Sequence, residues 1–240
     1  MSIRPRVALV TGASGDIGGA VVSRLVADGL TVWGVDLAES SARVEGQGGH
    51  YVQCNVLDRD AVEAAIDEIV SRTGSLDVLV NTASAPVAVG SFAKSEPESW
   101  EAALSSLSAT LICSRVAIPW LREGQHPRII SVGSLSARGT RNMAVYSAAK
   151  AALDAFSAAL ALELGELGVT VNTVSPGPVD GARQSSRTPD QVAARLANIP
   201  AGRFAEPPEV ASAVSFLASL DAGYVSGQSI VLSGGAQIAG

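Results

Sequence analysis

The chain has 240 residues, of which 47% are hydrophobic, 17% charged and 4% aromatic, and its formal net charge is −6. This length suits one sizeable core, and no lysine and arginine cluster stands out, so we expect a single domain over residues 1–240 and no nucleic-acid partner. The sequence shows neither a signal peptide nor an uninterrupted apolar run of about 18 residues, which predicts no membrane span and a cytoplasmic location. Cys54 and Cys113 have no disulfide or metal-site spacing and are expected to be small buried residues.

The first predicted element is a strand over residues 6–11, a short apolar run typical of a strand that is buried on both faces. A glycine-rich turn follows at residues 12–19, and a helical pattern covers residues 20–28. A strand, a glycine turn and a helix form the first half of a dinucleotide-binding unit, because the N–H groups at the helix start bind a pyrophosphate. A plain tight turn would have the same sequence, so this motif alone is weak.

The second predicted strand, residues 31–36, ends on Asp36. An acidic residue about 20 residues beyond a glycine turn can accept hydrogen bonds from an adenosine ribose. Its charge would repel a 2′-phosphate, and no arginine directly follows it, so the predicted cofactor is NAD rather than NADP. The alternative is an aspartate that merely ends a strand.

The remaining elements alternate regularly along the chain. A third strand begins near Tyr51, and Asp58 is expected to cap the helix that follows it and ends near residue 73. Further strands are predicted at 76–81, 128–132, 168–175 and 229–232, and further helices at 97–121, 146–164 and 207–217. The polar, weakly patterned segment 181–199 is interpreted as a substrate lid. This order predicts an α/β fold, a single-domain doubly wound (Rossmann-type) parallel sheet of about seven strands with helices on both faces.

Tyr146 and Lys150 are four residues apart, so on a helix they share one face, and Ser134 lies twelve residues before the tyrosine. A lysine ammonium beside a phenol favours the phenolate, so we expect it to lower the pKa of Tyr146 from about 10. Such a tyrosine can exchange a proton with an alcohol oxygen, which the Ser134 hydroxyl could hold in place. A lone Tyr-x-x-x-Lys is more often a helix start with a surface lysine. The nicotinamide site indicated by the rest of the chain favours the catalytic interpretation.

Together these motifs resemble the short-chain dehydrogenase/reductase family over essentially the whole chain. The resemblance implies that Ser134, Tyr146 and Lys150 are catalytic, that Lys150 also holds the nicotinamide ribose, and that no metal takes part. It implies NAD contacts from the glycine turn and from the ends of the following strands: Gly12, Ser14, Gly15, Asp16, Ile17, Gly18, Asp36, Leu37, Asn55, Val56, Asn81, Ala83, Pro176, Gly177 and Val179. Substrate contacts are expected from Ala85, Ser136, Met143 and Pro178.

Among the departures of the chain from the family pattern, three matter most for the site. Asp16 stands where a glycine is common, and we expect its side chain to cap the helix and turn away from the pyrophosphate. The family's catalytic helix asparagine is missing, and alignment places Ser106 or Leu107 there; serine could bind the proton-relay water less well, and leucine could not. Gly181 replaces a threonine that often touches the cofactor carboxamide.

The leading functional prediction is an NAD(H)-dependent oxidoreductase that interconverts a secondary alcohol and a ketone by hydride transfer, with tyrosine acid/base catalysis. The first alternative is a 3-oxoacyl-thioester reductase acting on an acyl carrier, which Asp36 disfavours because that role usually uses NADPH. The second alternative, motivated by Asp16 and the missing asparagine, is a weakly catalytic or non-catalytic NAD-binding sensor or subunit.

The resemblance also implies a homotetramer, with the helices that start at Pro97 and Tyr146 at the main interface. An alanine-rich face on the second of these helices would permit close contact between subunits: Ala148, Ala152, Ala155 and Ala159. In a monomer the same face would instead be buried internally.

Overall fold

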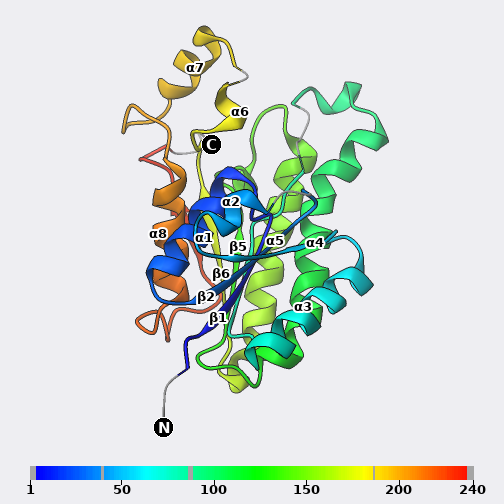
Figure 1. The fold of residues 1–240 in the computed structure, drawn as a ribbon. Helices are drawn as coiled ribbons and strands as arrows, with labels where there is room; N and C mark the ends of the chain where they lie inside the picture. The colour runs from blue at the N-terminus through cyan, green and yellow to red at the C-terminus, as the bar shows by residue number, and fades with distance from the viewer. Residues whose placement is uncertain (1–3, 39–40, 86–88, 186, 237–240) are drawn as a thin grey trace.

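The computed structural model describes residues 4–38, 41–85, 89–185 and 187–236, and a parallel sheet forms its centre (Figure 1). The sheet has seven strands in the order β3-β2-β1-β4-β5-β6-β7. Their bounds are β1 Val7–Thr11, β2 Thr31–Asp36, β3 His50–Gln53, β4 Val78–Asn81, β5 Arg128–Val132, β6 Thr170–Pro176 and β7 Ser229–Leu232. Strands β1, β4 and β5 are buried along their whole length, as expected for parallel strands covered on both faces. The predicted fold class is confirmed.

Helices cover both faces of this sheet (Figure 1). Helices α3 (Arg59–Thr73), α4 (Pro97–Leu121) and α5 (Ala144–Leu164) pack their apolar side chains into the core on one face. Helices α1 (Asp16–Ala27) and α8 (Pro207–Ala218) lie side by side on the other face, and the short α2 (Ala42–Glu45) contributes Val44 there. Each helix therefore buries one apolar stripe and leaves the carboxyl ends of the strands open for a site.

The lid predicted at 181–199 contains more regular structure than its weak pattern suggested. It holds α6 (Ala182–Ser185) and α7 (Pro189–Leu196), which lie above the carboxyl edge of the sheet, at the top of Figure 1. A capping box starts α7: Thr188 Oγ1 accepts from Gln191 N at 3.3 Å, and Gln191 Oε1 accepts from Thr188 N at 3.2 Å. The sequence Thr-Pro-x-Gln is the signal that could have predicted this helix start. The described residues also form three short 3₁₀ helices: η1 Phe92–Lys94, η2 Leu135–Arg138 and η3 Gly165–Leu167.

Two helices begin earlier than their sequence patterns indicated. Helix α5 begins at Ala144, so Tyr146 lies in its first turn, and α1 begins at Asp16 and includes Gly18. A Cβ at Gly18 would lie 2.1 Å from the carbonyl oxygen of Gly12, so close packing requires glycine despite its low helix propensity. The predicted cap of α3 is confirmed, because Asp58 Oδ1 accepts from Asp60 N at 3.0 Å and Ala61 N at 3.3 Å.

At the amino edge of the sheet, one buried carboxylate joins the segments that precede three central strands. Asp77 accepts from Arg4 Nη1 and from Val7 N, both at 2.7 Å, and from Gln125 N at 2.5 Å. Burial alone would raise the pKa of Asp77, but the Arg4 guanidinium and the backbone N–H donors outweigh it and lower that pKa below its usual value. This cluster fixes the starts of β1 and β4 relative to the segment before β5.

Both cysteines are buried, as predicted, with 4% of Cys54 and 1% of Cys113 exposed. Burial raises the pKa of Cys113 to about 12, which makes this thiol unreactive.

By length and composition alone, α4 and the stretch Ala144–Leu167 could each cross a membrane, but core helices that cover a sheet have the same character. The absence of a membrane span therefore stays a prediction.

Candidate active site

The strand order reverses between β1 and β4, and ligands of such sheets bind beyond the carboxyl ends of the strands at this point. The glycine turn after β1 meets the segment after β4 here. Gly12 has φ +65°, and a Cβ at this position would lie 2.7 Å from Ala83 Cα. The N–H of Ala83 donates to Thr11 Oγ1 at 3.3 Å. Glycine is thus required at residue 12 by both conformation and contact.

The glycine turn is anchored to the end of β2. Asp36 Oδ2 accepts from the backbone N–H of Ser14 at 2.9 Å, and Oδ1 accepts from Leu37 N at 2.7 Å. Gly15 is the N-cap residue of α1, and among the described residues no side chain caps the helix start. The first N–H groups of a helix have no partner within it, so this end can bind an anion.

Asp16 does not cap α1, so that prediction is wrong. Its carboxylate points across to the lid, where Oδ2 accepts from the backbone N–H of Ala182 at 2.9 Å, and Oδ1 lies 3.4 Å from Arg43 Nη1. The Asp16 carboxylate accepts from a backbone N–H 166 residues further along the chain instead of capping its own helix. The sequence around Asp16 gives no sign of this distant contact.

The other residues predicted to contact the cofactor follow strands at the same edge. Asn81 ends β4, and its Oδ1 is buried without a hydrogen-bond partner among the described residues. Asn55 follows β3 and accepts from Leu57 N at 3.1 Å, whereas Leu37 is largely exposed. Pro176 ends β6. Two contacts hold the residues that follow it at the same edge of the sheet: Gly177 N donates to Leu232 O at 2.8 Å, and Val179 forms a β-bridge with Ala205.

The predicted catalytic residues come from the end of β5 and the first turns of α5. Lys150 is 4% exposed, and its Nζ donates to the carbonyl oxygen of Val132 at 2.9 Å. The same Nζ lies 5.8 Å from the centroid of the Tyr146 ring. Ser134 lies two residues after the end of β5, and its Oγ accepts from Ser136 N at 3.1 Å. The structure thus places the lysine ammonium beside the tyrosine, as the spacing predicted.

The position of the missing helix asparagine contains a buried serine. Ser106 is 5% exposed in α4, and its hydroxyl donates to the carbonyl oxygen of Ala103 at 3.3 Å. A hydroxyl that donates to its own helix can still accept a hydrogen bond, so a role in holding a relay water stays a prediction.

One helical turn beyond Lys150 lies the half-buried Asp154, whose pKa is raised by burial.

A cavity of about 440 Å³ opens beside Tyr146. Its lining includes Met143 but not Ala85, Ser136 or Pro178, and residues 86–88 lie outside the described part of the chain. Sequence reasoning missed two walls of this cavity, Phe92 and Trp100, whose rings stack with centroids 5.5 Å apart. They sit on η1 and α4 across Pro97, and no periodic pattern links them. The surface of this cavity is mainly apolar, and Tyr146 forms part of its wall.

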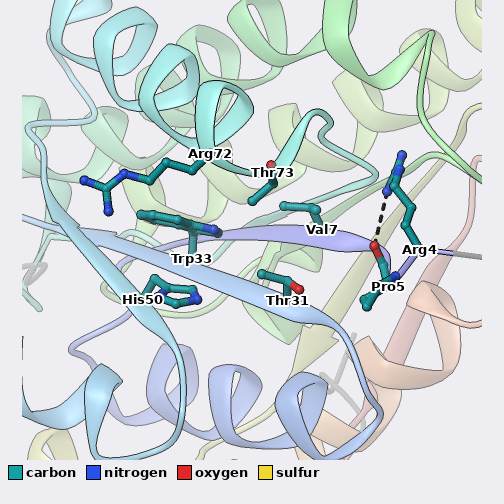
Figure 2. Close-up of a pocket in the computed structure, with 8 residues that line it drawn as sticks. All are labelled: Arg4, Pro5, Val7, Thr31, Trp33, His50, Arg72 and Thr73. Carbon is teal, nitrogen blue, oxygen red and sulfur yellow. Dashed lines mark hydrogen bonds between the residues drawn. The ribbon is translucent and has the colours of Figure 1, made fainter.

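A second cavity, of about 360 Å³, lies at the amino edge of the sheet and is lined by Trp33, His50 and Arg72 among others (Figure 2). Trp33 and His50 stack with centroids 4.6 Å apart, and the Arg72 guanidinium lies 5.4 Å from the Trp33 ring. None of the predicted site residues lines this cavity.

Within the described ranges, no group of three or more His, Cys, Asp or Glu residues could hold a metal ion.

Comparisons with known proteins identify relatives of this chain. A family model described as Enoyl-(Acyl carrier protein) reductase matches residues 12–237. A 3-oxoacyl-(acyl-carrier-protein) reductase from Vibrio harveyi is 35% identical over 241 residues, with 98% of each chain covered. An acetoacetyl-CoA reductase from Allochromatium vinosum is 34% identical, with 96% of this chain and 98% of the relative covered.

Two solved structures share the fold closely. A 3-ketoacyl-(acyl-carrier-protein) reductase from Brucella melitensis, complexed with NADH, has a TM-score of 0.90 at 28% identity and covers 97% of this chain and 98% of its own. The ligand-free aldohexose dehydrogenase of Thermoplasma acidophilum has a TM-score of 0.84 at 28% identity, with 97% of this chain and 94% of its own covered.

Proposed function

The chain belongs to the short-chain dehydrogenase/reductase family, and from that premise we propose that it is an NAD(H)-dependent enzyme that interconverts a secondary alcohol and a ketone. Membership makes it an oxidoreductase acting on a keto or hydroxyl group. The observation that carries the finer proposal is the position of Tyr146, which lines the apolar cavity and has the Lys150 ammonium 5.8 Å from its ring.

Two features of the carboxyl edge fit a dinucleotide. Helix α1 starts without a side-chain cap, and Asn81 Oδ1 is a buried acceptor without a partner among the described residues. In the proposed complex the start of α1 holds the pyrophosphate, Asp36 the adenosine ribose and Lys150 the nicotinamide ribose. The cofactor supplies or accepts the hydride when bound.

The protein's own residues handle the proton and the orientation. In the reducing direction the Tyr146 phenol donates its proton to the ketone oxygen, and in the oxidising direction the phenolate takes the proton of the alcohol. The Ser134 hydroxyl donates to the substrate oxygen and fixes it relative to the phenol. The Lys150 cation stabilises the phenolate that remains after reduction, and the Val132 carbonyl holds that cation in place.

A second candidate is favoured by a specific observation: the relatives with 33–35% identity are reductases of 3-oxoacyl thioesters or of acetoacetyl-CoA. The Brucella melitensis reductase was complexed with NADH. The expected preference of this chain for NADH therefore argues less strongly against 3-oxoacyl thioester substrates than the sequence suggested. The apolar cavity walls at Phe92, Trp100 and Val145 suit an acyl chain.

One set of assays tests both candidates. The oxidation of NADH and of NADPH is followed with a simple ketone, with acetoacetyl-CoA and without substrate. We expect turnover with NADH and, because Asp36 repels a 2′-phosphate, a kcat/KM at least about tenfold lower with NADPH. Preference for acetoacetyl-CoA over the ketone would select the thioester reductase. NADH binding without turnover on any substrate would contradict the enzymatic proposal and favour the NAD-binding sensor or subunit.

We also propose a cytoplasmic homotetramer. Ala148, Ala155 and Ala159 are exposed on α5, and Leu162 of the same helix is 85% exposed. Because these alanines are exposed, the structure does not support the alternative in which the alanine face is buried inside one protomer. A second copy of the chain would cover this face.

A further inference from the structure

The glycine turn and the lid are joined by one carboxylate. Asp16 is the first residue of α1, and Ala182 is the first residue of α6. Asp16 Oδ2 accepts from the backbone N–H of Ala182 at 2.9 Å. On its other side, Oδ1 lies 3.4 Å from Arg43 Nη1, which also donates to the carbonyl oxygen of Ser14 at 3.0 Å. The side chain thus connects the turn beyond β1 with the segment beyond β6.

Gly181 makes room for this contact. A Cβ at Gly181 would lie 2.4 Å from Asp16 Oδ2, and the φ of Gly181 is +138°, a conformation that L side chains rarely adopt. No other residue at position 181 is compatible with the observed place of the Asp16 carboxylate. The aspartate in the glycine turn and the glycine at the start of the lid, which the sequence shows as two separate departures, are therefore one structural feature.

The Asp16 carboxylate would repel a pyrophosphate bound at the start of α1. The start of a helix attracts either anion, because its free N–H groups and dipole are positive there. Two anions at one helix start repel each other. A pyrophosphate at the start of α1 therefore favours states in which Asp16 has moved away from the groove between the turn and the lid. Arg43 Nη1 already lies 3.4 Å from Oδ1 and would remain a partner of the carboxylate after it leaves Ala182.

We propose that Asp16 is a positioning residue that holds the lid against the glycine turn in the free protein and releases it when the dinucleotide binds. The proposal rests on the proposed function only in that the chain binds NAD(H). Because coupling between two events is reciprocal, whatever frees Ala182 from Asp16 also tightens the binding of the dinucleotide. Asp16 thereby sets both the cofactor affinity and the mobility of the lid before the cofactor arrives.

Binding of NADH, measured by the fluorescence of the nicotinamide without any substrate, tests the first half. Asp16→Gly is expected to bind NADH about tenfold more tightly than the wild type, because it removes both the charge and the hydrogen bond. Asp16→Asn keeps an acceptor for Ala182 N without the charge and is expected to fall between the two. Asp180→Asn is the matched control, because Asp180 Oδ1 accepts from the N–H of the neighbouring Gly181 at 2.9 Å; its affinity should equal that of the wild type. Equal affinity of the wild type and Asp16→Gly would overturn the proposal.

Hydrogen exchange at the amide of Ala182 tests the second half. Without NADH, we expect Asp16→Gly to exchange at this amide about tenfold faster than the wild type, while Asp16→Asn remains protected. Saturating NADH should accelerate the same amide in the wild type and leave it unchanged in Asp16→Gly. Slower exchange in the NADH-bound wild type would show that the cofactor closes the contact, and would refute the release.

A double-mutant cycle separates this contact from general damage. Gly181→Ala should accelerate exchange at residue 182 in the wild type, because its Cβ displaces the Asp16 carboxylate, and should have a smaller effect in the Asp16→Gly background. Equal effects in both backgrounds would contradict the proposal. Failure of the proposed function has a different signature, namely NADH binding without turnover, whereas no NADH binding in any variant would overturn both.

Discussion

Lys150 is a charged side chain held almost entirely out of solvent. The Val132 carbonyl oxygen accepts a hydrogen bond from its ammonium, and the Tyr146 ring lies beside it. A buried cation next to a phenol at the wall of an apolar cavity is an arrangement that would suit general acid/base catalysis.

Replacing Tyr146 by phenylalanine tests this arrangement directly. The ring and its packing remain, but the proton donor is lost, so we expect kcat to fall by about 10²–10⁴-fold. The affinity for NADH, measured by fluorescence, should stay within a factor of about two because the cofactor groove is unchanged. Turnover close to that of the wild type would exclude Tyr146 as the acid/base.

At this scale the sequence predicts a residue's place well when its partner is near in the chain. Tyr146 and Lys150 share a helix face whatever surrounds them, and Asp58 caps the helix it precedes. Asp16 was misplaced because its partner, Ala182, lies on the other side of the site. The Phe92–Trp100 stack was missed because it depends on how η1 folds back on α4.

Among the elements, the strands are positioned from both of their ends. Their carboxyl ends carry the site, while Asp77 joins the segments at the amino ends of β1, β4 and β5. The side chain of Asp77 is 0% exposed and that of Arg4 33%, so the pair is only partly shielded from water. This carboxylate therefore adds side-chain hydrogen bonds to the backbone pairing that aligns these strands.

Asp77→Asn should therefore destabilise the fold by about 2 kcal/mol at pH 7, because hydrogen bonds to a charged group are lost. The pKa of Asp77 is depressed in the folded protein, so its contribution is complete above the unfolded value of about 3.9 and is lost as the pH falls through the folded value. Urea unfolding at pH 7 and below pH 4 should show the difference between wild type and variant shrinking in acid. The exposed Asp67→Asn is the control; a difference independent of pH would contradict this account.

The cap of α3 provides a local test of element stability. Asp58→Ala removes the acceptor for the N–H groups of residues 60 and 61 and should cost about 1 kcal/mol in urea unfolding. Asp60 is the second residue of α3, so Asp60→Ala keeps the Asp58 cap and should lower the free energy of unfolding by less. Equal losses for both variants would show that the charge at the helix start, and not the cap, is what stabilises α3.

For the whole molecule, the topology followed from the sequence while the contacts of the lid did not. Alternation of apolar strands and amphipathic helices leaves few arrangements, because crossovers between parallel strands are right-handed. The contents of 181–199 were underestimated, since α6 is short and α7 buries no residue completely. Such helices are stabilised by tertiary contacts and caps, which periodicity does not show.

Assembly is also a property of this scale, and the exposed face of α5 allows it to be tested. Ala155→Arg would place an unpaired charge in the proposed interface, so light scattering should show a smaller mass than for the wild type, with unchanged circular dichroism. Ala64→Arg on the exposed side of α3 is the matched control and should leave the mass unaltered. A wild type that scatters as a monomer would contradict the tetramer.

The bond between Asp36 and the N–H of Ser14 limits how this protein can be redesigned. A change of coenzyme preference toward a 2′-phosphate would require replacing the acid at the end of the second strand. Here that acid is also the anchor of the loop on which the phosphates would rest. A successful redesign must therefore supply a substitute acceptor for Ser14 along with the new positive charge, and single replacements at position 36 would loosen the binding of both coenzymes.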